Sequence, residues 1–145
     1  MQDQAANVAY LIRVVRIAFI VSGGLFIYVM VRIPSQAEAS PAPTLEWTII
    51  IMSLVCIAVG FLAPRFLAGT MRTQGPPQKQ FTMTILSLAF FEAAILFGLV
   101  LHFLGADVLF VRVAVAAGMI SQLVWSPPSL PNPEDEDTLG PRQMP

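Results

Sequence analysis

Residues 86–105 read LSLAFFEAAILFGLVLHFLG, an apolar run that contains one carboxylate, Glu92, and one imidazole, His102. At the helical rise of ~1.5 Å per residue the run is about 30 Å long, which is the thickness of the hydrocarbon core of a bilayer. A charged side chain at that depth costs about 3 kcal/mol on insertion scales, so an intramembrane acid is a hypothesis for a functional site. We therefore predict a membrane-spanning helix with Glu92 as its residue of interest.

The composition supports a membrane protein. Of the 145 residues, 56% are hydrophobic and 12% are charged, which is more apolar surface than a soluble core of this size can bury. The net charge of −1 and the scattered Lys and Arg residues argue against a nucleic-acid partner. The single cysteine, Cys56, can form no intrachain disulfide and is expected to behave as a small apolar side chain.

Three further apolar runs complete the predicted fold, an all-α integral membrane protein with an antiparallel four-helix bundle. Pro34 ends the first run, Gly75-Pro76-Pro77 separates the second from the third, and the short link Gly105-Ala106-Asp107 makes a tight hairpin of the third and fourth. Asp107 is a candidate N-cap, and Gly118 a candidate for a close helix contact. The predicted spans are about 10–33, 45–67, 81–104 and 108–125.

The domain prediction is a four-helix transmembrane domain over residues 1–128 and a disordered tail over residues 129–145. The tail is rich in proline and carries four consecutive acidic residues at 134–137. An alternative for residues 1–37 is a signal peptide that is cleaved after Ala37, which would leave three spans in the mature protein. The first helix runs on through Tyr28 and Arg32 without a polar region before the cleavage site, which favours a retained helix.

Basic and aromatic residues near the span ends predict how the chain sits in a membrane. Five of them are expected to anchor the helices in the headgroup layers: Arg13, Arg16, Trp47, Arg112 and Trp125. The positive-inside rule compares Arg13, Arg16, Arg65, Arg72, Lys79 and Arg142 on one side with Arg32 and Arg112 on the other. We expect a multi-pass protein of the bacterial inner membrane with both termini in the cytoplasm.

Glu92 and His102 are the ionisable side chains well inside the third predicted helix. Ten residues of helix separate them by about 15 Å along the axis, so they do not form a direct pair. Glu92 is interpreted as a buried polar contact, as a reversible proton site, or as a contact to a partner protein. His102 is interpreted as a hydrogen-bonding residue near the interface.

The sequence supplies no pattern for catalysis or for a cofactor. No Cys, His or acid cluster accompanies His102, so no metal site is predicted, and the glycines follow no phosphate-binding or dinucleotide-binding pattern. No nucleophile with a placed base can be assembled. We expect no enzyme, no cofactor and no small-molecule substrate, with the lipid bilayer and another membrane protein or a second copy of this chain as partners.

The segment from Leu86 to Val100, LSLAFFEAAILFGLV, resembles the carboxylate-bearing helix of the rotor c subunit of F-type ATP synthases. In that family the glutamate binds and releases the transported proton, and the matching position here is Glu92, with Ala93 and Gly98 also matching. The second helix offers only Gly60 and Gly69 where the c subunit has repeated glycines. The resemblance therefore implies a proton-carrying role for Glu92 without implying a ring.

Over its whole length the chain resembles small four-span bacterial membrane proteins that have no assigned function. Three hypotheses follow for its role. The first is a non-enzymatic integral membrane protein in which Glu92 makes a mid-membrane polar contact, within the bundle or to a partner subunit. The second is a proton-handling component with Glu92 as the carrier, and the third is an assembly or accessory factor of a membrane complex.

Overall fold

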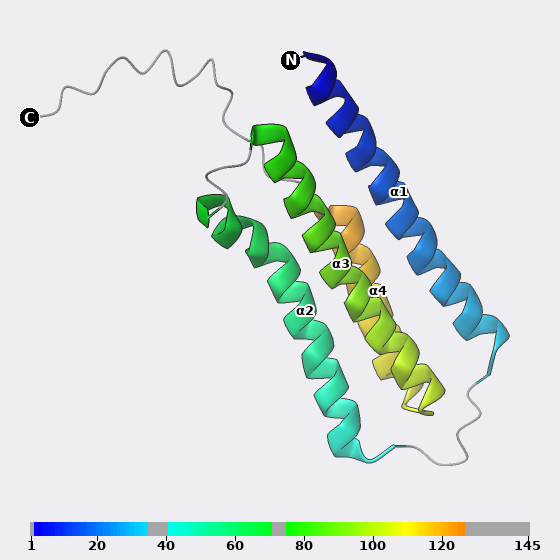
Figure 1. Ribbon diagram of the computed structural model, residues 1–145. Coiled ribbons are helices and arrows are strands. Elements are labelled where there is room, and N and C mark those ends of the chain that lie inside the picture. The colour runs from blue at the N-terminus through cyan, green and yellow to red at the C-terminus, as the bar shows by residue number, and fades with distance from the viewer. Residues whose placement is uncertain (1, 35–40, 71–74, 127–145) are drawn as a thin grey trace, which may run out of the picture.

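The computed structural model describes residues 2–34, 41–70 and 75–126, and in this part of the chain it forms four helices and no strands. They are α1 (Gln2–Arg32), α2 (Pro43–Thr70), α3 (Pro76–Phe103) and α4 (Val108–Val124). The helices run alternately in opposite directions and pack side by side (Figure 1). The predicted all-α antiparallel four-helix bundle is confirmed.

Helix α3 is the centre of the bundle because it is the main packing partner of each of the other three helices. In its most apolar stretch 44% of the residues are buried, against 6% in α1 and 11% in α2. Two clusters of buried residues lie along it, one around Leu88 and Phe91 and the other around Leu101. The helix that carries Glu92 is therefore the one that the others surround.

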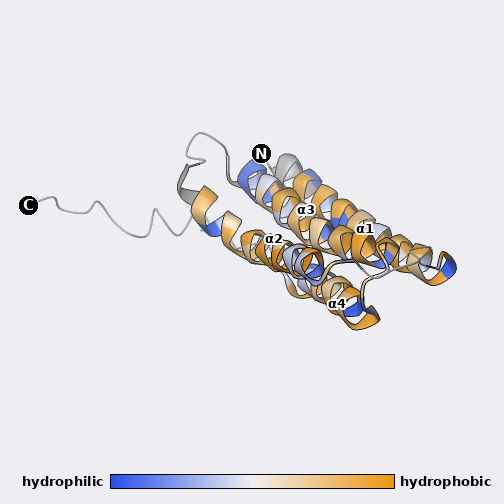
Figure 2. Ribbon diagram, turned by 90° about the horizontal axis from the view of Figure 1, so that it is seen from below, coloured by the Kyte–Doolittle hydropathy of each residue, from blue (hydrophilic) through white to orange (hydrophobic). Residues whose placement is uncertain are grey.

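Three helices are long and apolar enough to cross a membrane, namely Asn7–Arg32, Pro43–Leu67 and Pro77–Phe103. Many large apolar side chains are exposed on the outside of the bundle. Figure 2 shows hydrophobic residues along all four helices. Examples are Ile17 in α1 and Phe66 in α2, which are 61% and 73% exposed. Exposed apolar side chains of this kind are suited to contact with lipid.

The fourth helix is shorter than the others. Its 17 residues give it a length of about 25 Å, whereas the apolar part of α3 is about 40 Å long. Trp125, just past the end of α4, packs against Leu88 and Phe91. The segment of α3 from Pro76 to Leu88, about 18 Å, thus continues beyond the end of α4.

The helices extend beyond several of the predicted spans. Helix α1 begins at Gln2 instead of residue 10, because residues 2–9 contain neither glycine nor proline and continue the helix into polar sequence. Helix α3 begins at Pro76 instead of residue 81, because proline fits the first turn, where its missing N–H would have no partner. Helix α2 runs through Pro64 and ends at Thr70. The predicted tail, 129–145, lies outside the described residues.

The hairpin of α3 and α4 forms as the sequence predicts. Gly105 takes a φ of 73°, a left-handed conformation that favours glycine, and turns the chain after α3. Asp107 caps α4, since its Oδ1 accepts a hydrogen bond from the backbone N–H of Leu109 at 2.7 Å. A Cβ built on Gly118 would lie 3.1 Å from the carbonyl oxygen of Phe91 and 2.6 Å from a side-chain carbon of Ile95. Glycine at this position lets the two helix backbones touch.

Candidate functional site

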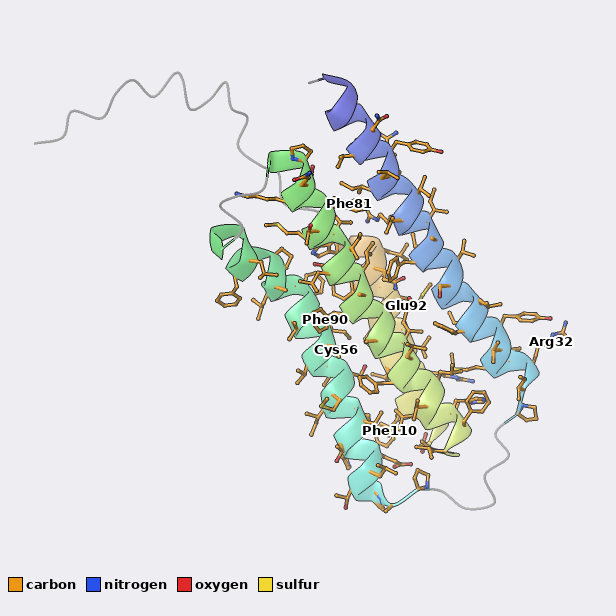
Figure 3. The ribbon with its side chains drawn as sticks, in the orientation of Figure 1. Arg32, Cys56, Phe81, Phe90, Glu92 and Phe110 are labelled. Carbon is orange, nitrogen blue, oxygen red and sulfur yellow. The ribbon has the colours of Figure 1, made fainter. Side chains whose placement is uncertain are left out.

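Glu92 lies near the middle of α3 (Figure 3). It forms a hydrogen bond to the last turn of α4. Gln122 donates its Nε2 to Glu92 Oε2 at 2.7 Å. Gln122 is fully buried and Glu92 is half-buried. The acid that the sequence singles out is therefore paired within the bundle, by a neutral amide.

Two oxygen atoms of this pair have no hydrogen-bond partner. Glu92 Oε1 and Gln122 Oε1 are both shielded from solvent and bond to nothing in the described structure. The hydroxyl oxygen of Ser87, one turn before Phe91 on α3, is in the same condition. A buried polar atom without a partner costs about 1–3 kcal/mol. The unpaired oxygens therefore offset part of the stability that the Glu92–Gln122 hydrogen bond contributes.

Helix α1 packs beside the Glu92–Gln122 pair that joins α3 and α4. A Cβ built on Gly23 would lie 2.6 Å from Met119 Sδ and 3.7 Å from Gln122 Oε1. Gly24, the next residue, has nothing within 4 Å of such a Cβ. Gly23 therefore gives α1 its close approach to α4 beside Gln122, and Gly24 faces away.

Arg16 of α1 binds the open end of α4. Its Nη2 lies 2.9 Å from the carbonyl oxygen of Leu123, 2.8 Å from that of Trp125 and 3.5 Å from that of Gln122. The last carbonyls of a helix have no partner within the helix, and in lipid they need a donor from elsewhere in the protein. The guanidinium of Arg16 is that donor, and its positive charge interacts favourably with the negative C-terminal end of the helix dipole.

His102 joins the other ends of α1 and α3. Its Nε2 lies 2.8 Å from the carbonyl oxygen of Ile33, and because a carbonyl only accepts, Nε2 carries the proton of this hydrogen bond. The contact lies near the end of α3, about 15 Å along the helix from Glu92. His102 and Glu92 thus belong to separate contacts.

The remaining predicted anchors take different positions. Arg13 and Arg112 are exposed, and Trp47 is 55% exposed with an edge contact to Phe110 at 5.4 Å between ring centroids. Trp125 differs from the prediction of an interface residue, since it is only 5% exposed and packs edge-on against Phe91. The early end of α4 turns this indole into the bundle.

Sequence reasoning missed Gln122 and the role of Arg16. Gln122 is a polar residue in the otherwise apolar run of α4, and that could have marked it as a partner for Glu92. Arg16 looks like any basic residue near a span end, and only the depth at which α4 ends shows what it binds. The described residues contain no group of three His, Cys, Asp or Glu side chains that could hold a metal ion.

The chain matches no protein-family model, and the comparisons with curated proteins and with solved structures likewise found no match. The likeness of residues 86–100 to the c-subunit helix therefore remains a local resemblance of sequence.

Proposed function

We propose that this chain is a small integral membrane protein without catalytic activity, in which Glu92 serves to fix α4 against α3 within the membrane. The observation that carries the proposal is the 2.7 Å hydrogen bond from Gln122 to Glu92. Helices in lipid gain little from hydrophobic association, so packing and interhelical hydrogen bonds decide their arrangement. The Glu92 contact, the Arg16 contacts and the close approach at Gly118 supply these.

Substitution of Glu92 tests this role. Glu92→Gln keeps an oxygen that can accept from Gln122, whereas Glu92→Leu has none. We expect the Gln variant to unfold in detergent at about the temperature of the wild type and the Leu variant to unfold earlier. Equal stability of all three proteins would contradict a structural role for Glu92.

A second function, reversible proton binding, is favoured by the unpaired oxygens. A carboxylate at Glu92 accepts from the amide Nε2 as observed, and a protonated carboxyl would donate to the amide oxygen once the amide is turned over. Glutamine can thus hydrogen-bond either form of the acid. A proton-handling role, which the c-subunit resemblance raises, requires a partner that accommodates both forms of the acid.

Carbodiimide labelling separates the two functions. A proton-exchanging Glu92 should be modified at low pH and protected at high pH, as followed by mass spectrometry of the α3 peptide. Glu92→Gln provides the unlabelled control. Labelling that does not change with pH would count against proton exchange and leave the structural role standing.

An accessory role in a larger complex shares the same chemistry and differs in requiring a stable partner. Purification in mild detergent tests it, and recovery of the chain alone at every detergent strength would contradict it. For localisation we propose the bacterial inner membrane with both termini in the cytoplasm. Arg13, Arg65 and Lys79 lie toward one end of the bundle and Arg32 and Arg112 toward the other, which supports this orientation.

A further inference from the structure

A groove of about 880 Å³ lies between α1 and α4 at the end of the bundle where α4 begins. Its walls are apolar, with Ile27, Met30 and Val31 from α1 and Val111, Val115 and Met119 from α4. His102 and Arg112 also line the groove. The groove separates the two helices here, whereas Gly23 lies against Met119 of α4 nearer the middle of the bundle.

The groove has the length of one lipid leaflet. On α4 its lining runs from Val108 to Met119, about 16 Å by the helical rise. Half of a hydrocarbon core of about 30 Å is about 15 Å. A single acyl chain that enters at the end of the bundle would therefore reach from the headgroup layer to the bottom of the groove near Met119.

The positive charge of Arg112 at the mouth of the groove favours a lipid with an anionic headgroup. Arg112 lies one turn into α4, is exposed, and makes no hydrogen bond or ion pair with any described residue. A guanidinium binds phosphate oxygens through two parallel N–H donors, and near the end of a span it can extend to the interface. The other cation at this end, Arg32, is placed over the ring of Tyr28 and does not line the groove.

We propose that the groove between α1 and α4 binds one anionic phospholipid, with an acyl chain along the apolar walls and the phosphate on Arg112. The lipid belongs to the leaflet into which the first turns of α4 extend. It fills the space between α4 and the last turns of α1, beyond the contacts that join the middle of α1 to the C-terminal end of α4. This site is independent of Glu92, which lies deeper in the bundle and is paired with Gln122.

Native mass spectrometry of the full chain in mild detergent tests the proposal, with phosphatidylglycerol as the probe and phosphatidylcholine as the neutral comparison. We expect one phosphatidylglycerol per chain to be retained in preference to phosphatidylcholine. Arg112→Gln should weaken phosphatidylglycerol binding about tenfold, the effect of about 1.4 kcal/mol. The matched control is Arg32→Gln, which should leave binding unchanged.

A second pair of variants tests the apolar part of the site. Ala116 lines the groove and is exposed, so Ala116→Phe should fill it and lower retention of both lipids. Val113, on the outside of the same helix, is 51% exposed and does not line the groove, so Val113→Phe should have no effect. Equal affinity for the two lipids, equal losses in Arg112→Gln and Arg32→Gln, or unchanged binding in Ala116→Phe would each overturn the proposal.

Discussion

Gln122 Nε2 lies 2.7 Å from Glu92 Oε2 and connects the last turn of α4 to the middle of α3. We predict that Glu92→Leu and Gln122→Leu destabilise the protein and that the double variant is less destabilised than the two losses together. The expected coupling is about 1 kcal/mol, the range of hydrogen bonds between helices in membranes. Reversible unfolding of the four proteins in mixed micelles measures it, and strictly additive losses would show that the bond contributes nothing.

Arg16 caps α4 in the structure, so Arg16→Ala should loosen the last turn of that helix. The carbonyls of Leu123 and Trp125 lose their donor, at an expected cost of about 1–3 kcal/mol. Hydrogen exchange should then become faster near the end of α4. Arg13→Ala, which removes an exposed arginine from the same helix, is the control and should change neither stability nor exchange. The same loss in both variants would point to membrane anchoring instead.

Gly118 and Gly24 allow a test of backbone packing. Gly118→Ala places a methyl group against the carbonyl of Phe91 and the N–H of Ile95, which cannot move away without separating α3 from α4. A loss of about 1–3 kcal/mol is expected, as for other overpacked positions. Gly24→Ala meets open space and should be neutral or slightly stabilising. Thermal unfolding in detergent compares them, and equal stability would contradict the close approach.

The orientation is testable with single cysteines. In a Cys56→Ala background, a cysteine in place of Gln78, at the start of α3, and one in place of Val108, at the start of α4, lie at opposite ends of the bundle. A membrane-impermeant maleimide added to intact cells should label position 108 and not position 78. The reverse pattern would place the termini outside the cytoplasm.

Retention of α1 is the remaining prediction. Arg16 and His102 both join α1 to the hairpin of α3 and α4, so removal of the first helix would leave the end of α4 without its donor. We expect N-terminal sequencing of the purified protein to find no N-terminus directly after Ala37. A new N-terminus after Ala37 would show that the first helix is a signal peptide.

The sequence predicted the features that depend on local pattern. The four helices, the tight hairpin and the cap at Asp107 follow from apolar runs, breakers and capping chemistry. The close approach at Gly118 follows from its small size, because small residues are the usual signal of close helix contacts in membranes. Each of these signals involves only a few neighbouring residues, so it can be recognised in a single sequence.

The features that the sequence did not predict depend on how far one helix slides along another. Whether Gln122 reaches Glu92, and whether Arg16 meets headgroups or carbonyls, is decided by the relative depth of α1, α3 and α4. The apolar residues on the outside of the helices do not indicate this relative depth, because an apolar side chain is equally stable at any depth in the hydrocarbon core. Trp125 illustrates the difference, since an indole before a proline predicts an interface and the early end of α4 buries it.

The short α4 also gives the molecule an uneven cross-section. Four helices share the depth from Val108 to Trp125, whereas only α1, α2 and α3 of the described helices continue beyond it (Figure 1). The bundle therefore displaces more lipid from one leaflet than from the other. A wedge-shaped protein relieves packing stress in a curved membrane when its wider end lies in the leaflet on the convex side. The protein should therefore concentrate where the leaflet that holds all four helices is convex.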